Sequence, residues 1–400
     1  MTISTLVSEE MTRRSWIRRM FEEGLRLKAE FGAENVFDFS LGNPDVPPPA
    51  RFQAVLEEEA VKTGAGLHGY MPNSGYDWVR EAVAASYAAQ TGLPFSRHEI
   101  IMSCGAGGGL NVVMKTLLDP GDEVILLTPY FVEYAFYVPN HGGKAVFVPT
   151  DDRFLPDMER IDAAITPRTK AVVINSPNNP TGVVYPRETL DALGSLLARA
   201  SARTGRIIYL LSDEPYRSLV FDGLTFPSPL PSYENTIVVT SSSKDLSLAG
   251  ERIGHIAISP QTPHKADIEA ACTFTTRTLG FLNANALMQR VVGRLQGEHV
   301  NARLYEKRRN MICDGLQALG FQFVRPQGAF YLFPRSPIQD DVEFSALMRK
   351  YRVIVVPGVG FAGSGHFRIS YAVPERTIER SLELFGKAAD ELGLRPPARS

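Results

Sequence analysis

The sequence has few cysteines and no excess of charge of either sign. Its 400 residues include only Cys104, Cys272 and Cys313, whose spacing fits neither a metal site nor a set of disulfides. An odd cysteine count in a chain of this length predicts a reducing, cytoplasmic compartment. Because 42 Lys and Arg face 44 Asp and Glu, the net charge of −2 gives no indication of a nucleic-acid partner.

Long apolar runs are also missing. The first residues, MTISTLVSEEMTRRSW, lack an apolar core of signal-peptide length. No stretch reaches the roughly 20 apolar residues of a membrane-spanning helix, so we expect no membrane partner. What is present is a globular composition, 44% apolar and 22% charged, in a chain long enough for one large domain and a smaller one.

Short apolar runs between residues 100 and 260 predict the large domain. There are seven of them: EIIMS, DEVILLTP, KAVFVP, KAVVINSP, RIIYLLSDEP, TIVVTSSS and GHIAIS. Nearly continuous Val, Ile and Leu are typical of strands buried on both faces, as in a mostly parallel sheet covered by helices. Several runs end in polar residues, such as Asn175, Asp213 and Ser241, and ligands of such sheets bind beyond the carboxyl ends of the strands.

The flanking regions predict a second, smaller α+β domain. Helical patterns cover residues 9–31 and 262–319, and short strands are expected at FQFV, AFYLFP, RVIVVPG and HFRISYA. We therefore expect a large domain over residues 50–290 and a small domain built from residues 1–49 and 291–400.

Three polar motifs follow the predicted strands. Asn179 lies in the proline-rich turn NSPNNPTG, Asp213 begins DEPYR, and Lys244 follows TIVVTSSS. Each alone is explained by a turn, a helix cap or a surface charge. Together they indicate more, because a desolvated lysine is nucleophilic toward an aldehyde and a carboxylate keeps a pyridine nitrogen protonated. A lysine with a carboxylate partner is typical of pyridoxal phosphate (PLP) sites.

The segment MSCGAGGGLNVVMKTLL predicts a phosphate site. A strand end, a glycine-rich turn and a helix start present backbone N–H groups to an anion, and Ser241, Ser243 and Arg252 can add donors. A nicotinamide-dependent oxidoreductase is an alternative interpretation of GAGGG. It is disfavoured because the third glycine of that fingerprint falls on Leu110.

The motifs NSPNNPTG, SDEPY, SSSK with GERIG, and FRISYA together resemble those of class I/II aminotransferases, fold-type I PLP enzymes related to aspartate aminotransferase. The resemblance covers nearly the whole chain. It implies an α/β fold with a mostly parallel seven-stranded sheet flanked by helices, plus a smaller α+β domain. It also implies transfer of an amino group from an L-amino acid, aspartate-like or of broad specificity, to a 2-oxo acid such as 2-oxoglutarate through a Schiff base on Lys244.

The resemblance implies a cofactor role for individual residues. Lys244 resembles the Schiff-base lysine and Asp213 the partner of the pyridine nitrogen. Tyr216 and Asn179 resemble the donors to the phenolate oxygen, with Asn179 also next to the substrate. Phe131, with Tyr130 as the competitor, resembles the aromatic residue that stacks on the ring. The expected phosphate-binding residues are Gly105, Ala106, Gly107, Ser241, Ser243 and Arg252. Relatives often have Ser or Thr where this chain has Gly107, so that position offers only its backbone N–H.

The resemblance also implies substrate and partner contacts. Arg368 resembles the arginine that binds the substrate α-carboxylate, and Gly42 and Asn43 resemble the loop that closes over it. Tyr70 resembles the tyrosine that reaches the phosphate of the neighbouring subunit, which implies a homodimer with shared active sites. For a distal carboxylate the candidate is Arg277, whose alternative is a solvated helix arginine.

Other functions share the same fold. A PLP-dependent carbon–sulfur β-lyase, or a lyase similar to aminocyclopropane-carboxylate synthase, would use the same cofactor residues and release product without a 2-oxo acid acceptor. A PLP-binding regulator without catalysis is disfavoured because Lys244, Asp213 and Arg368 are all present.

Overall fold

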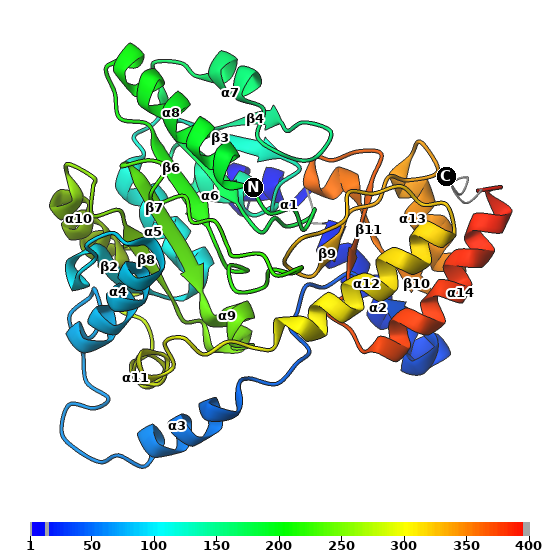
Figure 1. The fold of residues 1–400 in the computed structure, drawn as a ribbon, viewed down its shortest axis with the longest axis horizontal. Helices are drawn as coiled ribbons and strands as arrows, with labels where there is room; N and C mark the ends of the chain where they lie inside the picture. The colour runs from blue at the N-terminus through cyan, green and yellow to red at the C-terminus, as the bar shows by residue number, and fades with distance from the viewer. Residues whose placement is uncertain (1, 13–15, 395–400) are drawn as a thin grey trace.

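The computed structural model describes residues 2–12 and 16–394, and within them the largest sheet has seven strands. In sheet order they are β2 (Ile100–Ser103), β8 (Gly254–Ile258), β7 (Thr236–Ser241), β6 (Tyr209–Asp213), β5 (Thr169–Asn175), β3 (Glu123–Thr128) and β4 (Lys144–Pro149). β8 is antiparallel to both neighbours, and the other neighbouring strands are parallel (Figure 1). All seven predicted strands are confirmed.

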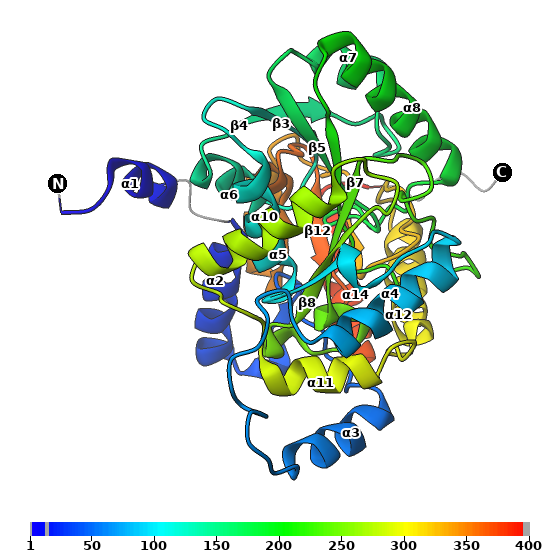
Figure 2. The ribbon, with the colours of Figure 1, turned by 90° about the vertical axis from the view of Figure 1, so that its left-hand side faces the viewer.

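Helices cover both faces of this sheet because its strands are apolar on both faces (Figure 2). Those on one face are α5 (Gly105–Leu117), α6 (Tyr134–Asn140) and α10 (Lys265–Thr278). Those on the other are α4 (Asp77–Thr91), α7 (Met158–Ala164), α8 (Arg187–Thr204) and α11 (Ala286–Arg294). Alternate residues of β3, such as Ile125 and Leu126, enter the two different apolar cores.

A smaller α+β part lies beside the large sheet. Its helices are α2 (Trp16–Phe31), α12 (Ala302–Ala318), α13 (Asp341–Lys350) and α14 (Glu375–Glu391). β11 (Val356–Pro357), β12 (Phe367–Ser370) and β9 (Tyr331–Leu332) form an antiparallel sheet, and β1 (Phe37–Asp38) pairs in parallel with β10 (Val353–Ile354). The predicted smaller α+β part is confirmed, and its boundaries in the sequence stay a prediction.

Two local predictions differ from the structure. FQFV, predicted as a strand, has no regular secondary structure. Instead, Phe321 donates its N–H to the carbonyl of Leu316 at the end of α12, and its ring packs against Phe344 and Phe367. The backbone at this point therefore completes a helix end. The helix predicted over residues 9–31 is described as α1 (Thr5–Thr12) and α2, and residues 13–15 lie outside the described part of the chain.

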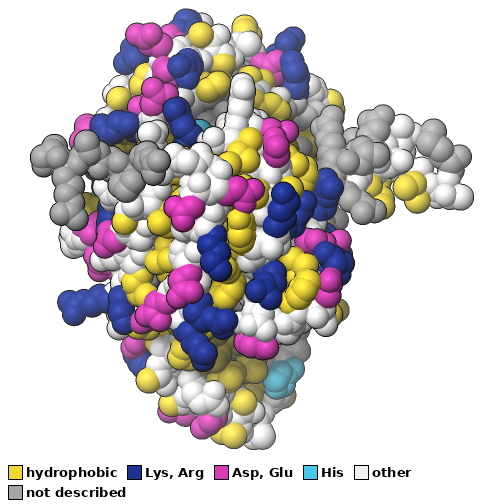
Figure 3. Space-filling model, turned by 90° about the vertical axis from the view of Figure 1, so that its right-hand side faces the viewer, with side chains coloured by type: hydrophobic (Ala, Val, Ile, Leu, Met, Phe, Trp, Pro, Cys, Tyr) yellow, Lys and Arg dark blue, Asp and Glu magenta, His cyan; other side chains and the backbone are white. Residues whose placement is uncertain are grey.

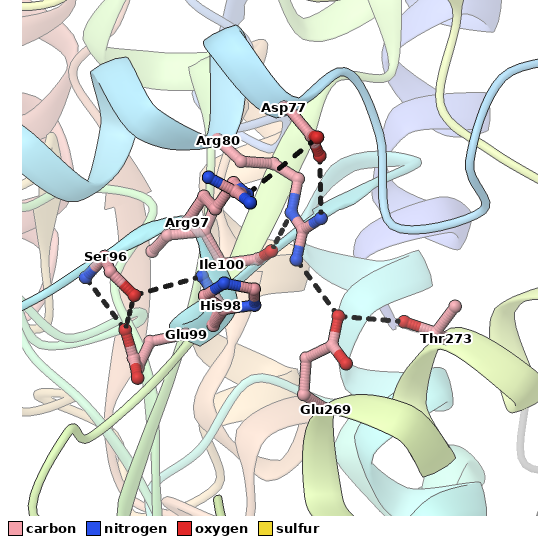
Figure 4. Close-up of polar contacts among 9 residues, drawn as sticks. All are labelled: Asp77, Arg80, Ser96, Arg97, His98, Glu99, Ile100, Glu269 and Thr273. Atoms are coloured by element: carbon pink, nitrogen blue, oxygen red, sulfur yellow. Dashed lines mark hydrogen bonds and ion pairs between the residues drawn. The ribbon is translucent and has the colours of Figure 1, made fainter. Parts of the chain in front are cut away.

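A buried arginine joins α4 to the first strand of the sheet (Figure 4). Arg80 donates to the carbonyl of Ile100 at 2.7 Å and pairs with Glu269 of α10 at 3.0 Å. Next to it, Ser96 and Glu99 form a reciprocal capping box before β2. These contacts fix the edge strand from which the chain enters the glycine-rich turn.

The surface carries both signs of charge. On the face seen in Figure 3, Lys and Arg are interspersed with Asp and Glu, in keeping with the net charge of −2. No helix in the described ranges combines the length and the apolar character needed to cross a membrane.

Helix α3 (Ala50–Ala60) is attached to α11 by a buried ion-pair cluster at the lower edge of the molecule in Figure 1. Glu59 accepts from Arg290 at 3.1 Å, from Arg294 at 2.8 Å and from Lys62 at 2.6 Å. The side chains of Glu59 and Arg290 are only 1% and 7% exposed. The Glu59 carboxylate therefore compensates a guanidinium that is itself removed from water.

We expect Glu59→Gln to lower the free energy of unfolding by about 3 kcal/mol, because it leaves the Arg290 charge buried without its partner. Urea unfolding followed by circular dichroism measures the change. Glu58→Gln is the matched control: this side chain is 60% exposed and pairs with the same Arg294, so its loss is expected to cost less than about 1 kcal/mol. Equal losses in the two variants would contradict the assignment of a buried cluster.

Candidate active site

The carboxyl ends of the central strands open into one cavity of about 300 Å³. β5 ends at Asn175 and β6 at Asp213, and the two are register partners, with the Asn175 side chain donating to the Asp213 carbonyl at 2.8 Å. β7 ends at Ser241. The predicted residues that line the cavity are Gly42, Ala106, Gly107, Phe131, Asn179, Asp213, Tyr216, Ser241, Ser243, Lys244, Arg252 and Arg368. The structure thus brings together most of the predicted site.

Lys244 lies on the short helix α9 (Ser242–Asp245), directly after β7. Its Nζ donates to the carbonyl of Gly42 at 2.8 Å and lies 5.6 Å from the centroid of the Phe330 ring. Burial lowers the pKa of Lys244 to about 8, and the charges of Arg252 and Arg368 act in the same direction. With this pKa, roughly a tenth of the amine is uncharged at pH 7 and able to act as nucleophile or base.

Asp213 is buried at the end of β6 and is only half hydrogen-bonded by side chains. The hydroxyl of Tyr134 donates to Oδ2, whereas Oδ1 has no partner among the described residues. Burial raises the pKa of Asp213 to about 7, and the Tyr134 hydrogen bond opposes this rise. A bare buried carboxylate oxygen calls for a positively charged donor, and the N–H of a protonated pyridine fits that need.

An anion site lies at the start of α5. Gly105 has a φ of +72°, a backbone conformation that favours glycine, and a Cβ at this residue would lie 2.7 Å from Nη2 of Arg252. The N-terminal N–H groups of α5, the hydroxyls of Ser241 and Ser243, and Arg252 surround one end of the cavity. These donors suit a phosphate group.

Arg368 lies on β12, lines the same cavity and is 1% exposed. Its guanidinium donates to Oδ1 of Asn179 at 3.0 Å and to the carbonyl of Ser40, and its Nε has no partner in the described part of the chain. The rings of Tyr331 and Phe361 lie on it, each with its centroid at 4.7 Å. This clamp fixes the plane of the guanidinium, as binding a carboxylate by two parallel hydrogen bonds requires.

Gly42 also has a steric reason to be glycine. A Cβ there would lie 1.9 Å from the Tyr331 hydroxyl, which itself lies 2.9 Å from the Tyr216 hydroxyl. Phe131 stands edge-on to Tyr134, with the ring centroids 5.5 Å apart. The loop, the tyrosine pair and the aromatic wall therefore enclose the cavity around Lys244.

Besides Gly105, which is buried at the start of α5, three predicted residues do not line the cavity of their own chain. Asn43 is exposed on the loop beyond Gly42. Tyr70 is 90% exposed, in a shallow hollow that also includes Asn283. Arg277 is exposed in the last turn of α10, with its guanidinium 5.2 Å from the ring centroid of Phe274. The predicted roles of these three residues stay predictions.

The sequence reasoning missed three tyrosines of the site. Tyr134 bonds to Asp213, Tyr137 lines the cavity near Gly107, and Tyr331 holds Arg368. A signal was present for two of them, because Tyr134 and Tyr137 are three residues apart in a helix and share a face. Tyr331 lies in FYLFP, where apolar neighbours indicate core packing.

A buried cluster of charged residues directly after Asp213 and Lys244 was also not predicted from the sequence. Glu214 follows Asp213, and Asp245 follows Lys244. Burial raises the pKa of both carboxyl groups to about 7, and the charge of Arg217 opposes the rise in both cases. Arg217 lies 4.0 Å from Glu214 and 4.6 Å from the centroid of the Tyr87 ring. One guanidinium is thus shared by carboxylates next to both central residues of the site.

Comparisons with known proteins show to which proteins the chain is similar. The family model for aminotransferase class I and II matches residues 34–385. The aspartate/prephenate aminotransferase of Thermus thermophilus is 38% identical over 353 residues, which cover 86% of this chain and 89% of that protein. A solved amino transferase from Eubacterium rectale has a TM-score of 0.95 at 35% identity, covering 98% of this chain and 99% of that chain. The Thermus thermophilus aspartate aminotransferase with maleate has a TM-score of 0.82 at 33% identity, covering 94% and 96%.

The lowered pKa of Lys244 predicts a pH dependence of stability in the cofactor-free protein. Between pH 8 and the ordinary value near 10.5, the unfolded chain binds a proton that the folded chain does not, so the free energy of unfolding rises with pH in this window. Within this window the titration of Lys244 raises the free energy of unfolding by up to about 1.4 kcal/mol per pH unit.

Urea unfolding of the wild type and of Lys244→Met between pH 7.5 and 9.5 isolates this contribution. We expect the difference in unfolding free energy between wild type and variant to grow in favour of the wild type as the pH rises. Parallel curves would show that the lysine titrates normally in the folded state.

Proposed function

The chain belongs to the class I and II aminotransferases, a family that uses pyridoxal phosphate, and we propose that it moves the amino group of an aspartate-like L-amino acid to a 2-oxo acid such as 2-oxoglutarate. The observation that carries the proposal is the pairing, in one cavity, of a desolvated lysine amine with a buried carboxylate that has one bare oxygen. A lysine and a carboxylate are the two protein groups that this cofactor needs at its aldehyde and at its ring nitrogen.

The described residues fit pyridoxal phosphate at each of its ends. Lys244 would hold the aldehyde, and Oδ1 of Asp213 would accept a hydrogen bond from the ring nitrogen. Tyr216 and Asn179 would donate to the phenolic oxygen, and Phe131 would pack against the ring. The α5 N-terminus with Ser241, Ser243 and Arg252 would hold the phosphate. When bound, the cofactor supplies a ring that withdraws electrons and stabilises negative charge at the substrate Cα.

The chain's own groups then position the substrate and move its proton. Arg368 binds the α-carboxylate, and because its plane is fixed by two rings it also orients the Cα–H bond. The uncharged amine of Lys244 accepts the Cα proton of the amino donor and, in the second half of the reaction, delivers a proton to Cα of the amino acid formed from the 2-oxo acid. One group thus serves as base and then as acid. Asp213 would be ionised next to a cationic partner and would in turn keep the ring nitrogen protonated.

The amino donor is proposed from the relatives and from the cations of the cavity. Thermus thermophilus aspartate/prephenate aminotransferase is among the similar proteins, and the structure of a related enzyme holds maleate, a dicarboxylate. In the described cavity lining the cations are Lys244, Arg252 and Arg368, and each already has a role. A distal carboxylate therefore needs a cation from elsewhere.

We propose that a second copy of the chain supplies it. In a homodimer with shared sites, Arg277 of one subunit faces the distal carboxylate bound in the other, and Tyr70 reaches the phosphate there. Both side chains are exposed in the single chain, as residues that act across an interface would be. They come from neighbouring surface segments, since Asn73 next to the Tyr70 loop donates to the carbonyl of Leu282 beyond α10.

Lys244→Ala tests the proposed reaction. We expect it to abolish the visible absorption band of the protein-bound cofactor and to lower turnover with aspartate and 2-oxoglutarate by about 10³-fold or more, because both attachment and proton transfer are lost. Lys350→Ala, at an exposed lysine of α13, is the control and should retain both. A Lys244→Ala variant that keeps the band and the turnover would rule out the assignment. The same assay with a panel of amino acids identifies the donor.

Arg277→Ala tests whether Arg277 binds the distal carboxylate of the substrate. We expect kcat/KM for aspartate to fall by about 100-fold while that for phenylalanine changes by less than about twofold, because only aspartate loses a charge pair. Arg277→Lys keeps the charge and should recover part of the aspartate activity. Equal losses with the two amino acids would remove Arg277 from the substrate site.

A further inference from the structure

The hydroxyl group of Tyr137 lies next to the position that a Cβ on Gly107 would occupy. A Cβ built on Gly107 would lie 3.0 Å from Oη of Tyr137 and 3.9 Å from its Cζ. Beyond the adjacent residues and the helix backbone, no other atom of residues 2–12 and 16–394 lies within 4 Å. Gly107 and Tyr137 both line the cavity, as do Ser241, Ser243 and Arg252. The Tyr137 hydroxyl therefore lies next to the space that a hydroxyl side chain at position 107 would fill.

Tyr137 is held in this place by its own helix. Its ring packs against the apolar core between α5, α6 and the sheet. It lies one turn after Tyr134, whose hydroxyl donates to Asp213, so the two tyrosines point from one face of α6 toward one cavity. Within the described residues the Tyr137 hydroxyl makes no hydrogen bond, whereas Tyr134 already has its partner.

The Tyr137 hydroxyl keeps its proton and is available as a donor. Burial raises its pKa above the ordinary value, the negative charges of Glu133 and Asp213 add to the rise, and Arg252 opposes it. A phosphate dianion accepts several hydrogen bonds, and a neutral hydroxyl adds a donor without adding charge next to the guanidinium of Arg252.

We propose that Tyr137 is a phosphate-binding residue of this site: its hydroxyl donates to the phosphate of the cofactor in place of the side chain that Gly107 lacks. The inference rests on the proposed function, because it takes the ligand of the cavity to be a phosphate ester. It adds to that function a residue from α6, an element that would otherwise contribute only aromatic packing and the Tyr134 contact.

The test compares two ligands that differ only in the phosphate. Cofactor-free wild type and Tyr137→Phe are titrated with pyridoxal phosphate and with pyridoxal, following the visible absorption of the bound ligand. We expect Tyr137→Phe to weaken the binding of pyridoxal phosphate by roughly tenfold or more, since a hydrogen bond to a charged group is lost. Binding of pyridoxal should change by less than about twofold. Tyr351→Phe removes a hydroxyl far from the cavity and should change neither affinity.

A double variant supplies the hydroxyl group from position 107 and not from position 137. Gly107→Ser combined with Tyr137→Phe places a hydroxyl group next to the space that the tyrosine oxygen leaves, and should recover most of the affinity for pyridoxal phosphate. Gly107→Ser alone should weaken binding, because its Cβ meets the tyrosine oxygen at 3.0 Å. The thermal midpoint of each variant confirms that it is folded.

The outcomes separate this inference from the proposed function. A wild type that binds no pyridoxal phosphate overturns both. A wild type that binds it tightly, with Tyr137→Phe either unchanged or weakened equally toward pyridoxal, overturns the role of Tyr137 and leaves the proposed function standing. A loss confined to the phosphate ester, with recovery in the double variant, supports the inference.

Discussion

The buried carboxylate of Asp213 is the group around which the site is arranged. An ionised carboxylate removed from water needs compensation at both oxygens, and the chain compensates only one of them, through Tyr134. The free energy of folding therefore includes a cost at this position, which a cationic ring nitrogen removes on binding. The bare Oδ1 therefore favours a positively charged hydrogen-bond donor at this position.

The sheet holds this carboxylate and the lysine amine in a fixed relation. Asp213 is the register partner of Val239 on β7, and Glu214 donates its N–H to the carbonyl of that same residue. β7 then leads directly into α9 and Lys244. Because neighbouring parallel strands cannot slip by one residue without turning buried side chains outward, the separation of the two groups is set by the core. Arg217, shared by the carboxylates that follow both residues, adds a second connection.

The features that could be predicted from the sequence are those that depend on a local residue pattern. The seven strands follow from their apolar runs, and Asp213 and Lys244 follow from polar residues at strand ends. The contact of Tyr134 with Asp213 could not be predicted in this way, since it joins residues 79 positions apart and depends on how α6 packs on the sheet. The strand prediction for FQFV was wrong for a similar reason. Its Phe321 completes the end of α12 and packs in an aromatic cluster. Tyr70 and Arg277 lie outside their own cavity, so a role for them requires a second chain.

The proton on the cofactor ring nitrogen tests this account most directly. The protein is loaded with pyridoxal phosphate labelled with ¹⁵N in the ring, and the nitrogen chemical shift is recorded by NMR across neutral pH for the wild type and for Asp213→Asn. The account predicts the shift of a protonated pyridine in the wild type and that of an unprotonated one in the variant. An unprotonated ring nitrogen in the wild type would contradict the role assigned to the Asp213 carboxylate.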